Sequence, residues 1–236
     1  MTEESRNARP RYAIIAALEY EEELLRNEMK DRCSSTLLGT PVFTGTIGNN
    51  DVVLMRSGMG KVSAGIGAQV LIDRFHPDYI INTGCAGALD KALGIGDTVI
   101  SDCVVEWDLD LRAIGFPLGY IDALKCVEMQ ADAALADQMQ QAVSGNVRRG
   151  LIVSGDQFVS TDAQRQTIRQ HFPNALCAEM EGAAIGHVCR QNGIPFCILR
   201  TMSDTADGDS GVDFAAFSKV AGEQSAAFLL EMLRKA

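Results

Sequence analysis

The chain has 236 residues, of which 47% are hydrophobic and 22% are charged, and its formal net charge at pH 7 is -10. This composition allows a sizeable core and argues against intrinsic disorder. The negative charge disfavours nucleic acids and anionic membranes as partners, and suits a small uncharged or cationic ligand better.

Short apolar runs alternate with helical patterns along the chain. We expect a disordered tail over residues 1–11 and a single domain over residues 12–236. The predicted strands cover residues 12–18, two runs within 42–58, 77–89 (ending in a Gly/Ala loop), 96–111, 150–160 (running into a polar loop) and 195–204. The predicted helices cover residues 19–30, 61–75, 131–143, 161–172 and 212–236, and residues 175–193 predict a short strand followed by a helix.

This alternation, with one early hairpin, predicts an α/β fold. We expect a three-layer sandwich whose central twisted sheet is mixed, mostly parallel and flanked by helices. In such sheets ligands bind beyond the carboxyl ends of the strands. Six of these ends carry glycine, serine or carboxylates where a structural turn needs only Gly, Asn or Pro: residues 19–21, 57–61, 82–88, 154–158, 178–182 and 200–204.

The turn SGMGKV (residues 57–62) is similar to a phosphate-binding loop but does not match the residue spacing of that motif. Met55 and Val62 stand where that motif needs glycine and Ser or Thr. A tight strand-to-helix turn is the simpler interpretation. No Gly-x-Gly-x-x-Gly motif follows the first strand, which disfavours a dinucleotide.

Carboxylates gather at the predicted strand ends. Glu179 and Glu181 are two residues apart, so in an extended strand they share a face while Met180 points the other way. They could also be ordinary acidic residues at a helix start. Glu21 and Asp204 at the same edge of the sheet favour a site, because clustered carboxylates are costly without a function.

The seven cysteines form no Cys-x-x-Cys pair and no Cys/His group with zinc-ligand spacing, so we expect free thiols in a reducing compartment and no metal. Cys85 has no histidine partner in a readable motif, which favours a packed thiol over a nucleophile. Trp107 is interpreted as a packing residue. The N-terminus has no signal-peptide core and no apolar run is long enough to span a membrane, so a cytoplasmic location is predicted.

Seven segments spread over the chain resemble the bacterial 5′-methylthioadenosine/S-adenosylhomocysteine nucleosidase family. They are AALEYEEELL, SGMGKVSAG, INTGCAGAL, IGDTVISD, GLIVSGDQFV, AEMEGAAIGHVC and RTMSDTAD. The resemblance runs from Tyr12 to the C-terminus. It implies a homodimer with the nucleoside phosphorylase fold that hydrolyses the N-glycosidic bond, releasing adenine and a 5-thioribose, without a cofactor.

The resemblance also implies roles for individual residues. Asp204 is the expected general acid that protonates N7 of adenine, with Ser203 orienting it. Glu21 is expected to hold and activate the attacking water, helped by Arg200, and Glu179 is a further supporting residue. The expected substrate contacts are Glu181 and Met180 at the ribose, Phe158 and Val159 at adenine, Cys85, Ala86 and Gly87 facing ribose and water, Met59 and Phe214 at the 5′-alkylthio group, and Phe116 from the partner subunit.

The chemistry explains these residue types. Adenine leaves as a neutral molecule once N7 is protonated, so the acid must hold its proton near neutral pH. The ribose becomes cationic as the bond breaks, and carboxylates stabilise that charge. Three features depart from the family pattern: Cys85 replaces the usual serine, residues 106–110 (EWDLD) differ, and residues 119–130 form a short segment.

Three alternatives stay open. A nucleoside phosphorylase would need grouped cations for phosphate, whereas the glycine-rich turn offers only Lys61. The substrate could be another adenine nucleoside, such as aminodeoxyfutalosine. The chain could also be a catalytically silent nucleoside-binding domain, although binding alone needs neither Glu21 nor Asp204.

Overall fold

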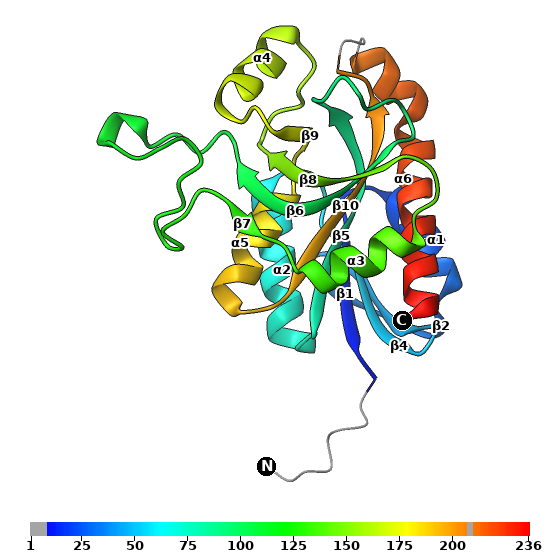
Figure 1. Ribbon diagram of the computed structural model, residues 1–236. Helices are drawn as coiled ribbons and strands as arrows, with labels where there is room; N and C mark the ends of the chain where they lie inside the picture. The colour runs from blue at the N-terminus through cyan, green and yellow to red at the C-terminus, as the bar shows by residue number, and fades with distance from the viewer. Residues whose placement is uncertain (1–8, 207–209) are drawn as a thin grey trace.

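The computed structural model describes residues 9–206 and 210–236 (Figure 1). Most of the expected tail lies outside these residues, and the first strand already begins at Arg11. The strands are β1 (Arg11–Ala16), β2 (Lys30–Leu37), β3 (Thr40–Ile47), β4 (Asn50–Arg56), β5 (Tyr79–Ala88), β6 (Thr98–Glu106), β7 (Met129–Gln130), β8 (Val147–Ser154), β9 (Ala175–Glu179) and β10 (Phe196–Asp204). The helices are α1 (Glu19–Glu28), α2 (Lys61–Phe75), α3 (Ala133–Ala142), α4 (Asp162–His171), α5 (Gly182–Asn192) and α6 (Ser210–Lys235).

The strands form one mixed sheet in the order β10-β6-β8-β9-β5-β1-β4-β3-β2, with β7 paired to β6. Strand β5 also pairs with β10, so β5, β10, β6, β8 and β9 form a closed circuit. The pairs of β1 with β4 and β5, and of β5 with β10, are parallel, whereas β2, β3 and β4 run antiparallel. The predicted α/β class, a mixed sheet flanked by helices, is confirmed.

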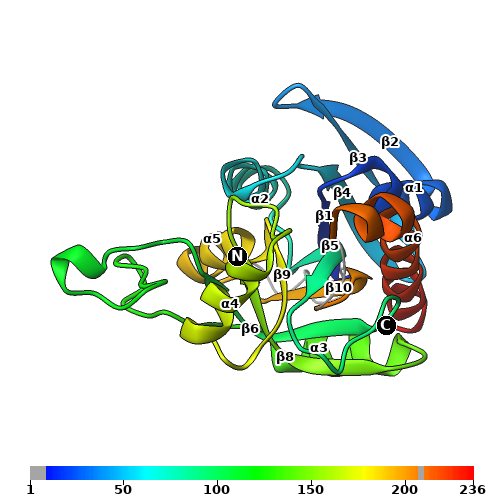
Figure 2. The ribbon, with the colours of Figure 1, turned by 90° about the horizontal axis from the view of Figure 1, so that it is seen from above.

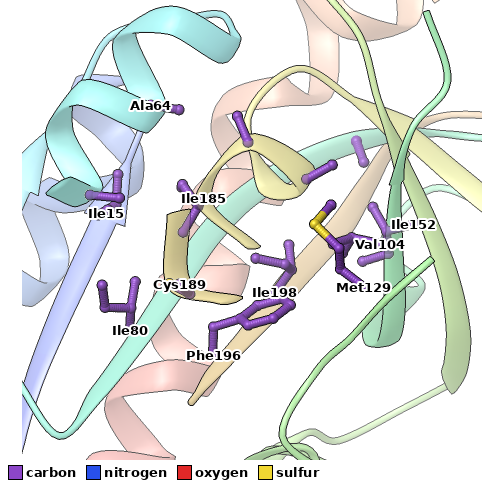
Figure 3. Packing of buried hydrophobic residues seen from close by; sticks show 14 of the residues in the cluster. Ile15, Ala64, Ile80, Val104, Met129, Ile152, Ile185, Cys189, Phe196 and Ile198 are labelled. Atoms are coloured by element: carbon purple, nitrogen blue, oxygen red, sulfur yellow. The ribbon is translucent and has the colours of Figure 1, made fainter. Parts of the chain in front are cut away.

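Helices cover the sheet in two groups. Helices α2 and α5 pack against each other, while α1 and α3 pack against α6 (Figure 2). Strand β1 shows why both groups of helices pack on an apolar face of the sheet. Successive side chains point to opposite sides of a strand, and both sides of β1 are apolar. Ile15 belongs to the cluster under α2 and α5 (Figure 3), and Ile14 to the cluster under α1, α3 and α6. Both are fully buried, which stabilises the fold by roughly 1.5–3 kcal/mol each.

Two local predictions were wrong. The helix expected over residues 19–30 ends at Glu28, and the chain turns directly into β2, whose residues are exposed up to Thr36 and so show no alternating apolar pattern. The Gly/Ala segment expected as a loop is the end of β5, which runs on to Ala88. Between β6 and β7 the chain makes a long protruding loop, seen in green at the left of Figures 1 and 2.

Candidate active site

A cavity of about 700 Å³, its open mouth included, lies at the carboxyl ends of β1, β5, β9 and β10. All the residues predicted for the site line it except Arg200 and Phe116: Glu21, Met59, Cys85, Ala86, Gly87, Phe158, Val159, Glu179, Met180, Glu181, Ser203, Asp204 and Phe214. Groups that are far apart in the sequence therefore face one small volume.

Glu21 is held by backbone amides at the start of α1. As the third residue of the helix it reaches back, and its Oε2 accepts hydrogen bonds from the amides of Ala17 (2.9 Å) and Leu18 (2.8 Å). Its Oε1 accepts from the Cys85 amide on β5 at 3.1 Å. Burial raises the pKa of this carboxyl, while the Arg200 charge and the amides oppose the rise. A buried, fixed carboxylate of this kind suits a base that holds a water molecule.

Two glycines of β5 let the carboxylates come close to the strand. A Cβ at Gly84 would lie 2.5 Å from Oε1 of Glu21, and a Cβ at Gly87 would lie 2.9 Å from Oδ2 of Asp204. Any side chain at either position would occupy the space of a carboxylate oxygen. The two glycines of TGCAG (residues 83–87) therefore determine how closely Glu21 and Asp204 approach β5.

Asp204 reaches the cavity through an irregularity in β10. Arg200 pairs with Gly84 and Met202 with Ala86, but Asp204 pairs with Gly87, so Ser203 is an extra residue in the register. Bulges of this kind re-aim side chains next to active sites. The Ser203 hydroxyl donates to Oδ1 of Asp204 at 2.9 Å and lies 3.3 Å from the Ala86 carbonyl oxygen. This serine is thus placed to orient the acid.

Arg200 lies behind the cavity wall, with only 1% of its side chain exposed. Its Nη2 donates to Glu179 and Asn82 and lies 3.6 Å from Oε2 of Glu181. Burial alone would lower the pKa of this guanidinium, but Glu179, Glu181 and Glu21 raise it, so the group stays charged. A fixed positive charge at this point stabilises the buried carboxylates around it.

Glu179 is occupied by structural contacts. Its carboxylate accepts hydrogen bonds from the amides of Glu181 (3.0 Å) and Gly182 (2.8 Å), from the Ser154 hydroxyl and from Arg200. These contacts join the end of β9 to the beginning of α5. Glu179 therefore holds Arg200 and the start of α5 in place; its supporting role in the reaction stays a prediction.

Glu181 faces the cavity for a reason other than the predicted one. Strand β9 ends at Glu179 and Glu181 is the N-cap residue of α5, so the two do not share an extended face, and Met180 also lines the cavity. Oε1 of Glu181 accepts from the Gly60 amide at 2.8 Å. Burial, and then the charge of Glu179, raise the pKa of Glu181 to about 7.

Cys85 is placed as a donor to Glu21. Its Sγ lies 3.6 Å from Oε1 of Glu21. Burial and the neighbouring Glu21 charge raise the pKa of the thiol far above its usual value, so it stays protonated. A protonated thiol is a poor nucleophile, which agrees with the packed-thiol interpretation. Trp107 is 7% exposed and belongs to a hydrophobic cluster, as expected for a packing residue.

The opposite wall of the cavity is apolar. Phe158 and Phe214 make an edge-to-face pair with ring centroids 5.1 Å apart. Met59 is 62% exposed and Phe158 is 44% exposed, although both line the cavity. An apolar wall that remains this open to solvent is suited to cover a ligand, or to be covered by another protein surface.

The sequence analysis missed several lining residues. Leu18, Leu89 and Gln157 line the cavity, as does Arg165 of α4, which is 4% exposed and donates to Asp162 at 2.7 Å. Gln157 directly precedes Phe158 and Leu18 lies three residues before Glu21, so both could have been inferred from their positions. No local pattern marks Arg165, because its place depends on how α4 packs.

Lys61, the cation of the glycine-rich turn, is occupied. Its Nζ lies 2.6 Å from Oδ1 of Asp108 and 3.0 Å from Oε2 of Glu106. A lysine that two carboxylates neutralise is unsuited to hold a phosphate. Within residues 9–206 and 210–236 no group of three or more His, Cys, Asp or Glu side chains has a geometry that could hold a metal ion.

Comparison with known proteins places the chain in a family. A model of the phosphorylase superfamily matches residues 11–234. The 5′-methylthioadenosine/S-adenosylhomocysteine nucleosidase of Staphylococcus saprophyticus is 41% identical over 224 residues, which cover 94% of this chain and 98% of the relative. The chain belongs to this nucleosidase family. The nucleosidase of Haemophilus influenzae is 40% identical over 223 residues, covering 93% and 97%.

Solved structures agree with the nucleosidase family. The Neisseria meningitidis nucleosidase in complex with methylthio-immucillin-A is 35% identical, with a TM-score of 0.92 and coverage of 96% of this chain and 99% of that one. The futalosine hydrolase of Helicobacter pylori is 29% identical, with a TM-score of 0.90 and coverage of 96% and 98%. The fold is thus shared by enzymes whose names indicate different nucleosides.

Proposed function

We propose that this chain hydrolyses the N-glycosidic bond of 5′-methylthioadenosine and S-adenosylhomocysteine, with water as the second substrate. The observation that carries the proposal is that Glu21 and Asp204 line one cavity and approach the same strand at two glycines. Family membership supports the choice of substrates.

Asp204 acts as the acid in this proposal. Its carboxyl group gives a proton to N7 of adenine while Ser203 fixes its orientation. The leaving group then departs as neutral adenine. A positioned acid contributes typically about 10²- to 10⁴-fold to the rate.

The remaining carboxylates act on the sugar. As the bond breaks, the ribose becomes cationic, and Glu21 and Glu181 face a charge that the ground state lacks. Interactions that strengthen only in the transition state accelerate the chemical step. Glu21, held by three amides, orients the water that attacks the anomeric carbon and accepts its proton.

The cations support hydrolysis over phosphorolysis. Lys61 is neutralised by two carboxylates, and Arg200 is fully buried against Glu179. Arg165, which lines the cavity, is 4% exposed and donates to Asp162 at 2.7 Å. Phosphate binding needs exposed cations grouped at the site. A hydrolase of a futalosine-type adenine nucleoside is the second candidate, and it is favoured by the similarity to the Helicobacter pylori enzyme.

The active form in this proposal is a homodimer. Val62 (70% exposed) and Ile66 (48% exposed) lie one turn apart on α2, and Leu38 lines the same groove as Ile66. A second copy of the chain would cover this apolar surface and contribute Phe116, which stacks on Tyr120 at 4.6 Å within the protruding loop. Val62→Asp with Ile66→Asp is expected to give a monomer in analytical ultracentrifugation with a raised KM. A dimer that persists refutes this interface.

No helix of the described ranges 9–206 and 210–236 is long and apolar enough to cross a membrane. All seven cysteines are unpaired. Free thiols, several of them buried, support a reducing compartment such as the cytoplasm.

The test is a substrate panel in phosphate-free buffer. Adenine release is measured from 5′-methylthioadenosine, S-adenosylhomocysteine and aminodeoxyfutalosine, with and without added phosphate. Asp204→Asn is expected to lose at least about 10²-fold in kcat while calorimetry still detects substrate binding. Asp122→Asn, at an exposed ion pair with Lys125, is the matched control. A strict phosphate requirement, or normal turnover by Asp204→Asn, contradicts the proposal.

A further inference from the structure

Three loops, two of which line the cavity, are tied together by one ring of contacts. The Lys61 amide donates to Oδ1 of Asp156 at 2.7 Å, and the Asp156 amide donates to Oδ2 of Asp108 at 2.8 Å. Nζ of Lys61 donates to Oδ1 of Asp108 at 2.6 Å and closes the ring. The loops precede α2, follow β6 and follow β8.

Part of the ring is shielded from solvent: Lys61 and Asp108 are partly buried, whereas Asp156 is exposed. The side chains of Lys61 and Asp108 are only 16% and 15% exposed. Glu106 is a second partner of Lys61 at 3.0 Å and also contacts Nδ1 of His187 on α5 at 2.9 Å. Burial would lower the pKa of Lys61, but the hydrogen bond to Asp108 and the charge of Glu106 outweigh burial and raise it. Removing one partner of such a pair leaves a poorly solvated charge.

The ring adjoins the proposed sugar site. The Gly60 amide, next to the Lys61 amide in the chain, donates to Oε1 of Glu181 at 2.8 Å. Gly60 has φ +94°, which favours glycine, and a Cβ there would lie 3.1 Å from Oδ1 of Asp156. Two successive amides at the start of α2 thus hold Asp156 and Glu181.

The same ring flanks the apolar wall and the protruding loop. Met59 directly precedes Gly60, and Phe158 follows Asp156 by two residues. Both side chains line the cavity. Asp108 stands at the beginning of the protruding loop that carries Phe116.

We propose that Lys61, Asp108 and Asp156 form a positioning device that holds the Gly60 amide on Glu181 and fixes the wall that grips the ribose and the 5′ group. The device gives the SGMGK turn a role other than phosphate binding. This inference rests on the proposed function, because the ribose is the ligand that Glu181 would hold.

The device also affects protonation of Glu181. This carboxyl faces Glu179 on β9, Arg200 on β10, Glu21 on α1 and the Gly60 amide. The amide favours the ionised form, so its withdrawal raises the pKa of Glu181 further. The pH at which KM changes is therefore a readout that a general loss of stability would not move.

The experiment compares Asp156→Ala with Asp156→Asn in the full-length protein. The asparagine keeps an oxygen for the Lys61 amide, whereas the alanine loses it. For 5′-methylthioadenosine we expect Asp156→Ala to raise KM roughly tenfold, the cost of about one hydrogen bond, with kcat within about threefold, and to move the KM inflection to higher pH. Asp156→Asn is expected to keep the wild-type KM and the wild-type pH of the KM inflection. Asp108→Asn is expected to shift KM and the pH of its inflection in the same direction as Asp156→Ala does, but by a smaller amount.

A second readout needs no substrate. Hydrogen exchange of the peptide that contains Gly60 is expected to be faster in Asp156→Ala than in wild type, and normal in Asp156→Asn. Unchanged exchange in Asp156→Ala would contradict the claim that the ring holds the Gly60 amide in place. Faster exchange with unchanged KM and pH profile overturns its link to the sugar site. Absence of adenine release by wild type, with the exchange pattern intact, would instead contradict the proposed function.

Discussion

Gly84→Ala is expected to displace Glu21, the proposed base, without removing any side chain of the candidate site. The new Cβ would lie 2.5 Å from Oε1 of Glu21 and 3.2 Å from Nη1 of Arg200, whereas ordinary contacts begin at 3.4 Å. Oε2 of Glu21 is fixed by two amides, so the carboxylate must rotate or retreat by about 1 Å and lose its 3.1 Å bond from the Cys85 amide. A misplacement of about 1 Å costs on the order of 10²-fold, or about 2.7 kcal/mol of transition-state stabilisation.

The assay is steady-state release of adenine from 5′-methylthioadenosine, with thermal unfolding recorded on the same samples. Gly65→Ala is the matched control, because its Cβ would meet only Val188 at 3.7 Å, and alanine in place of glycine within α2 is expected to stabilise by up to about 1 kcal/mol. The expected result is a kcat loss confined to Gly84→Ala. If folded Gly84→Ala keeps kcat within about threefold of wild type, the close packing of Glu21 against Gly84 is not needed for catalysis, and the prediction is refuted.

Three further predictions concern the buried groups Glu181 and Cys85. The folded-state pKa of Glu181 is raised from 4.5 to about 7 by burial and Glu179, so ionisation of this group destabilises the fold as pH rises through that window. Glu181→Gln is therefore expected to have a higher Tm than wild type above pH 7, a difference that vanishes below pH 4.5; a gap independent of pH contradicts this. Cys85→Ser replaces a weak donor 3.6 Å from Glu21 by a stronger one, so kcat is expected to stay equal or rise, and a large loss refutes the donor role. In wild type, mass spectrometry is expected to find iodoacetamide on exposed Cys33 long before Cys85, whose pKa burial raises.

Much of the fold could be predicted because its signals are local. The buried run of β1 and the Thr161 cap of α4, whose hydroxyl accepts from the Gln164 amide, are set by nearby residues. Strand β2 carries no such signal, because its residues are exposed up to Thr36 and its place depends on pairing with β3. The closure of β5 onto both β10 and β9 is a tertiary event that no local pattern encodes.

Most residues that line the cavity could be named from the sequence, but their arrangement could not. The carboxylates stood out because they follow strands that end at one edge of the sheet. The reason for Glu181 was wrong, since it begins α5 instead of extending β9. The shift in β10 that turns Asp204 toward Gly87 depends on pairing with β5. Neither the burial of Arg165 nor the ring around Lys61 could be found from spacing, because each joins segments far apart in the chain.

The closed circuit of β5, β10, β6, β8 and β9 has a consequence for how substrate enters. A strand within a closed circuit has a hydrogen-bonded neighbour on both sides, so β5 and β10 cannot part without breaking the ladder that joins them. Glu21 and Asp204 both approach β5 at a glycine, so we expect the hydrogen-bonded strands of the circuit to keep their separation nearly constant. Admission of a nucleoside and escape of adenine must then depend on motion of the surrounding loops and helix ends. Mutations in these loops are therefore expected to change the rates of substrate entry and adenine release while leaving the positions of Glu21 and Asp204 intact.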